Sequence, residues 1–136
     1  MLSAMIWGFL MQKFSIRKLI RSFHYAFRGV ITLLNDQQNA RIHATITIIV
    51  GILAYVLDVG RVEVAVLFMA IIMVFAMEIM NTAVEKICDL VDENENAKIR
   101  FIKDGMAGAV LIASVIAVVV AILIFLPPLK LLLNKI

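Results

Sequence analysis

Three stretches of the chain carry no charged residue and together predict a membrane protein. The uncharged runs are Ala44–Leu57, Val64–Met77 and Gly105–Leu129. A spanning helix needs roughly 20 mostly apolar residues, so the third run is long enough alone. The first two reach that length when extended to Ile42–Val59 and Val62–Val84. We therefore expect three transmembrane helices, the third ending at Pro127-Pro128, because neither proline can continue a helix.

A different pattern precedes the first span, in the segment Phe14–Leu34. Its apolar residues recur at steps of one, three or four and form one stripe: Ile16, Leu19, Ile20, Phe23, Phe27, Val30, Ile31 and Leu34. Its basic residues lie largely off that stripe: Arg17, Lys18, Arg21, His24 and Arg28. A basic amphipathic helix of this kind lies in the membrane interface. Either it only anchors the chain, or some of its basic residues also contact phosphates. We expect no nucleic-acid partner.

The basic residues also predict an orientation. Six of the thirteen precede the first span: Lys13, Arg17, Lys18, Arg21, Arg28 and Arg41. The loop after the first span has only Arg61, whereas four follow the second span: Lys86, Lys98, Arg100 and Lys103. Cytoplasmic loops are enriched in Lys and Arg. The N-terminus and the second loop are therefore expected in the cytoplasm.

Composition supports this assignment and limits the number of domains. The 136 residues are 63% hydrophobic and 17% charged. Soluble domains have about 45–50% apolar and about 25% charged residues, so a soluble domain is excluded. We expect an all-α integral membrane protein with one domain at residues 14–129, an N-terminal extension at 1–13 and a tail at 130–136. The single cysteine, Cys88, excludes an internal disulfide.

Acidic and amide residues follow the second apolar run at helical spacing. Steps of three, four, four and three residues separate Glu78, Asn81, Glu85, Asp89 and Asp92. One continuous helix would place all five on one face. The last three are also explained as a solvated helix end. A charged group at mid-span costs about 2.5–3.5 kcal/mol on insertion scales, so Glu78 is expected to have a partner or a function.

These residue types suit phosphoryl transfer. Mg²⁺ prefers carboxylates and phosphates, and a carboxylate beside the membrane could act as general base for a lipid hydroxyl. At the start of the third span, Lys103 could neutralise phosphate oxygens, and Asp104 could face the acidic stripe. The chain has no GxxxxGK[ST] motif and no kinase-type glycine loop. A nucleotide kinase built from these parts would have an unrelated design.

The sequence resembles the bacterial membrane diacylglycerol kinases and undecaprenol kinases. "EIMNTAVEKICD" (Glu78–Asp89) is similar to the family pattern E-x-x-N-[ST]-A-[IV]-E-x-x-x-D, and "KDGMAGAVLI" (Lys103–Ile112) is similar to K-D-x-x-x-x-A-V-L. "FHYAFRGVITLL" and "NARIHA" resemble the N-terminal region of the family. The ending "IFLPPL" resembles the undecaprenol kinase branch. The resemblance covers roughly Phe14–Leu129.

The resemblance implies a homotrimer in the bacterial cytoplasmic membrane, with ATP as co-substrate, Mg²⁺, and active sites shared between subunits. It implies Glu78 as general base supported by Asn81, and Glu85 as a ligand of Mg²⁺ bound to ATP. The positions that it assigns to nucleotide contacts are Tyr25, Asn94, Glu95, Asn96, Lys103 and Asp104. Lys18 matches a basic position of the family, and its positive charge is retained.

One position departs from the family pattern. Two residues before the asparagine of "NARIH", the family has a metal-binding glutamate, whereas this chain has Gln37. A glutamine oxygen can coordinate Mg²⁺ but brings no negative charge. Asp36 is adjacent, yet one helical residue turns a side chain by about 100°. Either Asp36 substitutes after a local shift, or metal binding is weaker, or activity is impaired.

We therefore expect an ATP-dependent lipid kinase acting on undecaprenol or diacylglycerol. The ending and His43 favour undecaprenol, by resemblance only. Two alternatives stay open: a degenerate family member that binds lipid without phosphorylating it, and a non-enzymatic membrane protein in which Glu78 serves proton or cation movement.

Overall fold

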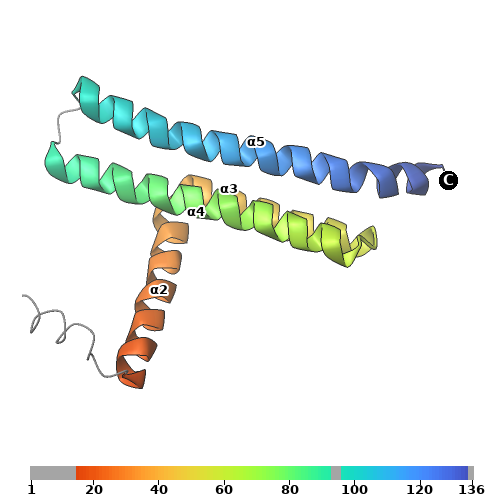
Figure 1. Cartoon of the computed structure of the whole chain (residues 1–136), viewed down its shortest axis with the longest axis horizontal. Coiled ribbons are helices and arrows are strands. Elements are labelled where there is room, and N and C mark those ends of the chain that lie inside the picture. Colours follow the sequence, from red (N-terminus) through yellow and green to blue (C-terminus); the bar gives the residue numbers. More distant parts are fainter. Residues whose placement is uncertain (1–14, 93–95, 135–136) are drawn as a thin grey trace, which may run out of the picture. The chain divides into compact units, whose positions relative to one another are not determined.

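The computed structural model describes residues 15–92 and 96–134, and every regular element in these ranges is a helix (Figure 1). The helices are α2 (Ile16–Asp36), α3 (Gln38–Val56), α4 (Arg61–Val91) and α5 (Ala97–Leu133). They belong to two compact units, residues 1–36 and residues 37–136. The first unit contains α2, and the second contains the other three helices. The predicted all-helical fold is confirmed.

Helix α2 is the amphipathic helix that the sequence predicts. The hydroxyl of Ser15 caps its start by accepting a hydrogen bond from Lys18 N at 3.4 Å, as serine commonly does before a helix. Large apolar side chains, among them Phe23 and Phe27, are exposed on it. An apolar stripe beside basic residues suits a membrane interface, and that location stays a prediction.

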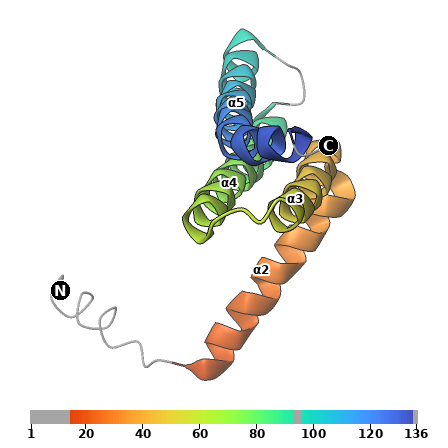
Figure 2. The ribbon, with the colours of Figure 1, turned by 90° about the vertical axis from the view of Figure 1, so that its right-hand side faces the viewer.

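The other three helices are each long and apolar enough to cross a membrane, which confirms the three predicted spans. Each of them runs antiparallel to the one before it in the chain, and the three lie side by side (Figures 1 and 2). Helix α4 packs mainly against α5, and α3 covers a shorter part of both. At 1.5 Å per residue, α3 is about 28 Å long and α4 about 46 Å. The hairpin of α4 and α5 therefore extends beyond α3. In the short α3–α4 loop, Asp58 has a left-handed backbone (φ 47°), which aspartate tolerates better than most residues.

One face of α4 is buried, and it changes character along its length. Its buried residues recur at steps of three, four or seven apart from the adjacent pair Asn81 and Thr82: Leu67, Val74, Glu78, Asn81, Thr82 and Cys88. Apolar residues of the outward face, such as Phe68 and Met73, are exposed. Exposed apolar side chains are expected where the solvent is lipid. The buried face is thus apolar in the first half of α4 and polar at Glu78, Asn81 and Thr82.

One expected helix end differs in the structure. The prediction that the third span ends at Pro127-Pro128 is wrong, because α5 continues to Leu133 with both prolines inside it. Proline lacks one N–H but its fixed φ is compatible with a helix. The turn beyond is still closed by backbone hydrogen bonds, such as Asn134 N to Lys130 O at 3.1 Å. Helix α4 continues to Val91, so the acidic stripe does lie on one continuous helix up to Asp89, and Asp92 is the capping residue.

Candidate active site

Glu78 is the most deeply buried ionisable residue of the spans and lies where α3 begins to cover α4. Only 1% of it is exposed, and its Oε2 atom has no hydrogen-bond partner among the described residues. One turn earlier on α4, Phe75 meets the His43 ring of α3 edge-on, at 6.3 Å between ring centroids. Leaving such a polar atom buried and unpaired costs about 1–3 kcal/mol, and more for a charged group. The site therefore presents an unsatisfied acceptor at membrane depth.

Two further polar residues of α4 are buried beside Glu78. Asn81 and Thr82 are 6% and 7% exposed. Asn81 donates a hydrogen bond through Nδ2 to Glu85 Oε1 at 3.0 Å. The Oδ1 atom of Asn81 and the Oγ1 atom of Thr82 have no partner in the described part of the chain. We call Glu78, Asn81 and Thr82 the buried polar cluster.

The sequence analysis missed Thr82 as a functional residue. The available signal was its position, four residues after Glu78 and next to Asn81, which places it on the same side of the helix. Threonine is common on membrane helices, where its hydroxyl can bond to the backbone. Sequence alone therefore gave no reason to expect its hydroxyl to be unpaired.

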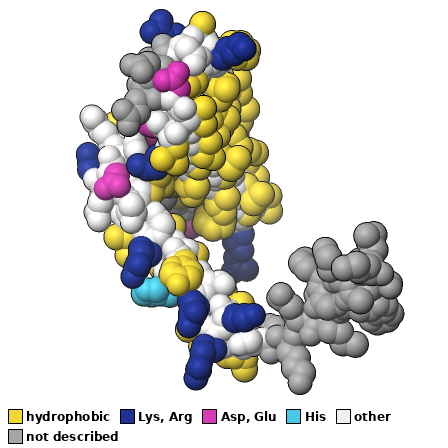
Figure 3. Space-filling view, turned by 90° about the vertical axis from the view of Figure 1, so that its left-hand side faces the viewer, with side chains coloured by type: hydrophobic (Ala, Val, Ile, Leu, Met, Phe, Trp, Pro, Cys, Tyr) yellow, Lys and Arg dark blue, Asp and Glu magenta, His cyan; other side chains and the backbone are white. Residues whose placement is uncertain are grey.

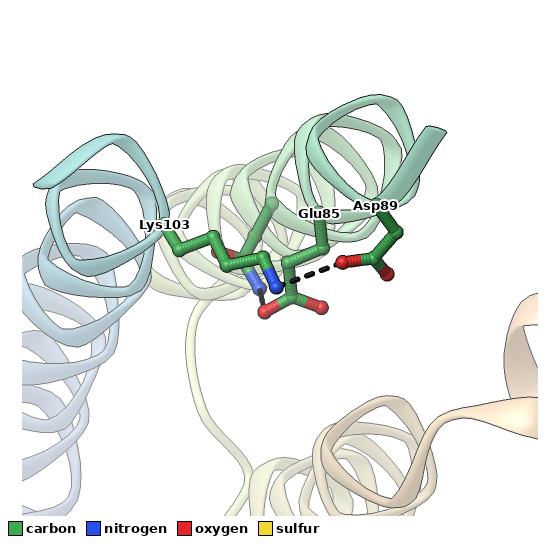
Figure 4. Close-up of polar contacts among 4 residues, drawn as sticks. Glu85, Asp89 and Lys103 are labelled. Atoms are coloured by element: carbon green, nitrogen blue, oxygen red, sulfur yellow. Dashed lines mark hydrogen bonds and ion pairs between the residues drawn. The ribbon is translucent and has the colours of Figure 1, made fainter. Parts of the chain in front are cut away.

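One to two turns further along α4, a second group of polar residues is more exposed and paired. Lys103 reaches from α5 and forms an ion pair with Asp89, at 2.8 Å between Nζ and Oδ1. Figure 4 shows Glu85 of α4 beside this ion pair. The Lys103 side chain is 21% exposed and that of Asp89 is 61% exposed. We call Glu85, Asp89 and Lys103 the surface ion cluster. Figure 3, which looks from this end, shows charged side chains beside a largely hydrophobic flank.

On the other side of Glu78 lies an apolar cavity of about 140 Å³ between α3, α4 and α5. Val74 and Phe75 of α4 line it, and Val74 is one turn from Glu78. His43, Thr47 and Ser114 are the polar residues in its lining. The buried polar cluster thus separates an apolar cavity inside the spans from charged side chains at the helix ends.

The remaining predicted residues of the α3–α5 unit are placed as follows. Asn96 caps α5, because its Oδ1 accepts hydrogen bonds from Lys98 N and Ile99 N and its Nδ2 donates one to Asp92. Asp104 is exposed and lines a shallow depression with Arg100. Its predicted contact with the nucleotide stays a prediction. Gln37 is the half-buried residue preceding α3, and its side chain makes no capping hydrogen bond.

Four predicted nucleotide contacts do not belong to the described part of the α3–α5 unit. Lys18 and Tyr25 are on α2, in the other unit, and both are exposed there. Tyr25 lies beside His24, at 6.1 Å between ring centroids. Asn94 and Glu95 lie outside the described residues. Their predicted roles stay predictions.

The carboxylate ligands available in the described part of the chain suit a metal ion that binds together with substrate phosphates. No group of three or more His, Cys, Asp or Glu side chains converges in the described ranges. Mg²⁺ in phosphate-transferring sites is usually held by one or two carboxylates together with substrate phosphates. Glu85 is half-buried on the face that leads to Glu78 and could supply such a carboxylate. The residues present fit this arrangement, and they do not form an all-protein cage.

Comparison with known proteins identifies the family of the chain. Residues 24–125 match the family described as prokaryotic diacylglycerol kinase. The chain belongs to this family. It is 31% identical over 114 residues to the undecaprenol kinase of Bacillus subtilis (strain 168), covering 84% of this chain and 93% of that protein. It is 38% identical over 112 residues to the diacylglycerol kinase of a Synechocystis strain, covering 82% of this chain and 64% of that protein.

Family membership establishes the class of protein and of reaction. The chain is a multi-pass membrane lipid kinase of a prokaryotic family, and ATP is the implied phosphate donor. This outcome confirms the kinase prediction over a non-enzymatic membrane protein. The relatives are named for two different lipid acceptors, undecaprenol and diacylglycerol, so the acceptor is not resolved at this level of identity.

Proposed function

We propose that this lipid kinase transfers the γ-phosphate of ATP to a lipid hydroxyl placed at the buried polar cluster. The observation that carries the proposal is the Oε2 atom of Glu78, which is buried and has no partner among the described residues. A group buried at such cost in a membrane helix is typical of a functional site. A lipid hydroxyl entering from the membrane would supply the missing hydrogen bond.

Glu78 acts in this proposal as the general base. Its carboxylate accepts the proton of the lipid alcohol while the alcohol oxygen forms a bond to the γ-phosphorus. The bond between that phosphorus and the bridging oxygen breaks, and ADP leaves with the electron pair. Positioned proton transfer contributes about 10²–10⁴-fold to rate. Asn81 supports the base by fixing Glu85, to which it is hydrogen-bonded one turn away.

The surface ion cluster handles the phosphates in this proposal. Lys103 neutralises phosphate oxygens, and Asp89 holds its ammonium in place until ATP binds. Glu85 would hold Mg²⁺ together with the phosphates, and the ion would supply charge neutralisation. Phosphoryl transfer depends mainly on positioning and on such neutralisation. Lys18, Tyr25, Asn94, Glu95, Asn96 and Asp104 are proposed nucleotide contacts.

Gln37 is proposed as a weak, uncharged contributor to the metal site. It precedes α3 and its side chain is not used in helix capping. An amide oxygen can coordinate Mg²⁺ but attracts it less than a carboxylate does. We therefore infer that this kinase needs more Mg²⁺ than a variant with a carboxylate at residue 37.

Undecaprenol is the proposed acceptor. The match to the undecaprenol kinase covers 93% of that protein, and the apolar cavity one turn from Glu78 suits a hydrocarbon chain that ends in a single hydroxyl. Diacylglycerol is the second candidate, because the relative named for it has the higher identity, 38%.

The assembly and the orientation are also proposals. We infer a homotrimer with shared active sites, because a partner subunit would supply contacts to the open side of the surface ion cluster, where Asp89 is 61% exposed. We infer that the N-terminus and the α4–α5 loop face the cytoplasm, which supplies ATP. The excess of Lys and Arg in these segments supports this orientation.

The test is transfer of labelled phosphate from ATP to undecaprenol and to diacylglycerol, side by side in mixed micelles. The variant Glu78→Gln serves as the blank. We expect transfer to undecaprenol well above transfer to diacylglycerol. The reverse preference would assign the second acceptor, and no transfer to either lipid from folded protein with ample Mg²⁺ would overturn the proposed function.

A further inference from the structure

The hydroxyl of Thr82 behaves differently from those of two other threonines in the membrane helices. Thr45 Oγ1 donates a hydrogen bond to Arg41 O at 2.9 Å, and Thr47 Oγ1 donates one to His43 O at 2.8 Å. A helical threonine usually satisfies its hydroxyl in this way, at the carbonyl four residues earlier. Thr82 is more buried than either, at 7% exposed, and its Oγ1 has no partner in the described ranges.

The position of Thr82 in the sequence places it on the same side of α4 as Glu78. Thr82 is four residues after Glu78, and Asn81 is three residues after it. At 100° per residue, the Thr82 side chain leaves the helix about 40° to one side of Glu78, and the Asn81 side chain about 60° to the other side. Three buried atoms without partners in the described ranges therefore belong to neighbouring positions on one side of α4: Glu78 Oε2, Asn81 Oδ1 and Thr82 Oγ1. Two are acceptors, and the hydroxyl alone can donate.

We propose that Thr82 contacts the lipid substrate directly, by donating a hydrogen bond to the oxygen of the alcohol that Glu78 deprotonates. This inference rests on the proposed function of Glu78. An alcohol oxygen carries one hydrogen and two lone pairs. The hydrogen is donated to Glu78, one lone pair accepts from Thr82, and the other lone pair faces phosphorus. Thr82 neither gains nor loses a proton, and its contribution is to orient the attacking oxygen.

The same arrangement gives the site a way to select its substrate. A lipid without a hydroxyl would leave both Glu78 Oε2 and Thr82 Oγ1 unpaired inside the spans. Sites built to hydrogen-bond a substrate hydroxyl discriminate strongly against analogues that lack it. Thr82 would therefore affect the use of the lipid and not the use of ATP.

The test compares Thr82→Val, which keeps the shape and removes the hydroxyl, with Thr82→Ser, which keeps the hydroxyl. Thr45→Val is the matched control, because it removes a hydroxyl that is bonded within its own helix. We expect Thr82→Val to lower kcat/KM for the lipid about tenfold or more, with KM for ATP unchanged. Thr82→Ser and Thr45→Val should stay within about threefold of the parent, the change expected when no buried polar group loses its partner.

Thermal unfolding separates a substrate contact from a structural one. Removing a buried hydroxyl that has no partner in the protein should leave the unfolding temperature of Thr82→Val unchanged or raised. A lowered unfolding temperature, a changed KM for ATP, or equal losses in the Val and Ser variants would overturn the proposal. So would parent-like lipid kinetics in Thr82→Val.

Glu78→Gln, assayed in the same series, distinguishes failure of this inference from failure of the proposed function. If Glu78→Gln is inactive and Thr82→Val is fully active, the base stands and the Thr82 contact is wrong. If Glu78→Gln retains parent activity, the base assignment is wrong, and the Thr82 contact, which depends on it, is wrong with it.

Discussion

The buried polar cluster lies on α4 and the surface ion cluster joins α4 to Lys103 of α5, and the polar atoms of the two clusters are satisfied differently. In the surface ion cluster, Lys103 and Asp89 pair at 2.8 Å, and Glu85 accepts a hydrogen bond from Asn81. In the buried polar cluster, Glu78 and Thr82 each keep a buried atom without a partner among the described residues. Solvent and counterions can satisfy the first group, whereas only protein or substrate can satisfy the second.

We infer from this difference that each cluster binds a different substrate. Exposed charges of both signs suit a soluble, highly charged ligand such as ATP, which exchanges with water and with the existing ion pair. A buried polar atom without a hydrogen-bond partner suits a ligand that arrives through the membrane and brings one hydroxyl. We therefore propose that α4 joins a lipid-facing and a water-facing half, and that phosphate transfer takes place where they meet.

The largest expected effect comes from removing the base in the buried polar cluster. Glu78→Gln keeps the size of the side chain and removes its ability to take a proton. We expect kcat to fall by about 10²-fold or more, the range for a positioned general base. Circular dichroism should show unchanged helix content. A rate within a few-fold of the parent would remove Glu78 from the chemistry.

A smaller effect is expected from removing the positive charge of Lys103 in the surface ion cluster. Lys103→Gln should raise KM for ATP about tenfold to a hundredfold, because a hydrogen bond to a charged group contributes about 1.5–3 kcal/mol. KM for the lipid should change little. Steady-state kinetics with each substrate varied in turn measures both, and an effect confined to the lipid would contradict the assignment.

Gln37→Glu adds a negative charge, so this variant should strengthen the proposed metal site, whereas the preceding variants each remove a functional group. We expect the Mg²⁺ concentration for half-maximal rate to fall about fivefold, since one charge contact in water is worth about 1 kcal/mol. Gln38→Glu, one residue further along, is the control for added charge alone. An unchanged Mg²⁺ dependence would place residue 37 outside the metal site.

Asp89→Asn should have the smallest effect. Its carboxylate is 61% exposed, and exposed ion pairs typically contribute about 0–1 kcal/mol. We expect KM for ATP within about threefold of the parent and no change in kcat. Kinetics at low and at high salt measure this pair. A loss as large as that of Lys103→Gln would show that Asp89 has a role beyond holding the lysine.

Periodicity predicted most of the fold. Uncharged runs gave the three spans, and the three- and four-residue steps after Glu78 correctly predicted that α4 continues beyond the apolar run. The helix end expected at Pro127-Pro128 was wrong, because a proline weakens a helix by one hydrogen bond and does not end it where neighbouring turns remain bonded.

The site was less predictable, because its details depend on side-chain orientation. Glu78 was found from the rarity of an acid in an apolar run. Asp104 was expected to face the acidic stripe; it is exposed, and its predicted role stays a prediction. Asn96 has a helix-capping role that the motif did not indicate. The unpaired hydroxyl of Thr82 required the packing of the spans to be known.

The most direct test of the account measures Mg·ATP binding and lipid phosphorylation on the same preparations of Glu78→Gln and Lys103→Gln. We predict that Glu78→Gln binds Mg·ATP as the parent does and transfers phosphate about 100-fold or more slowly than the parent. Lys103→Gln should bind Mg·ATP weakly and still transfer phosphate at saturating ATP. If both variants lose binding and transfer together, the two clusters are one functional unit, and the division between a lipid-facing and a water-facing half is wrong.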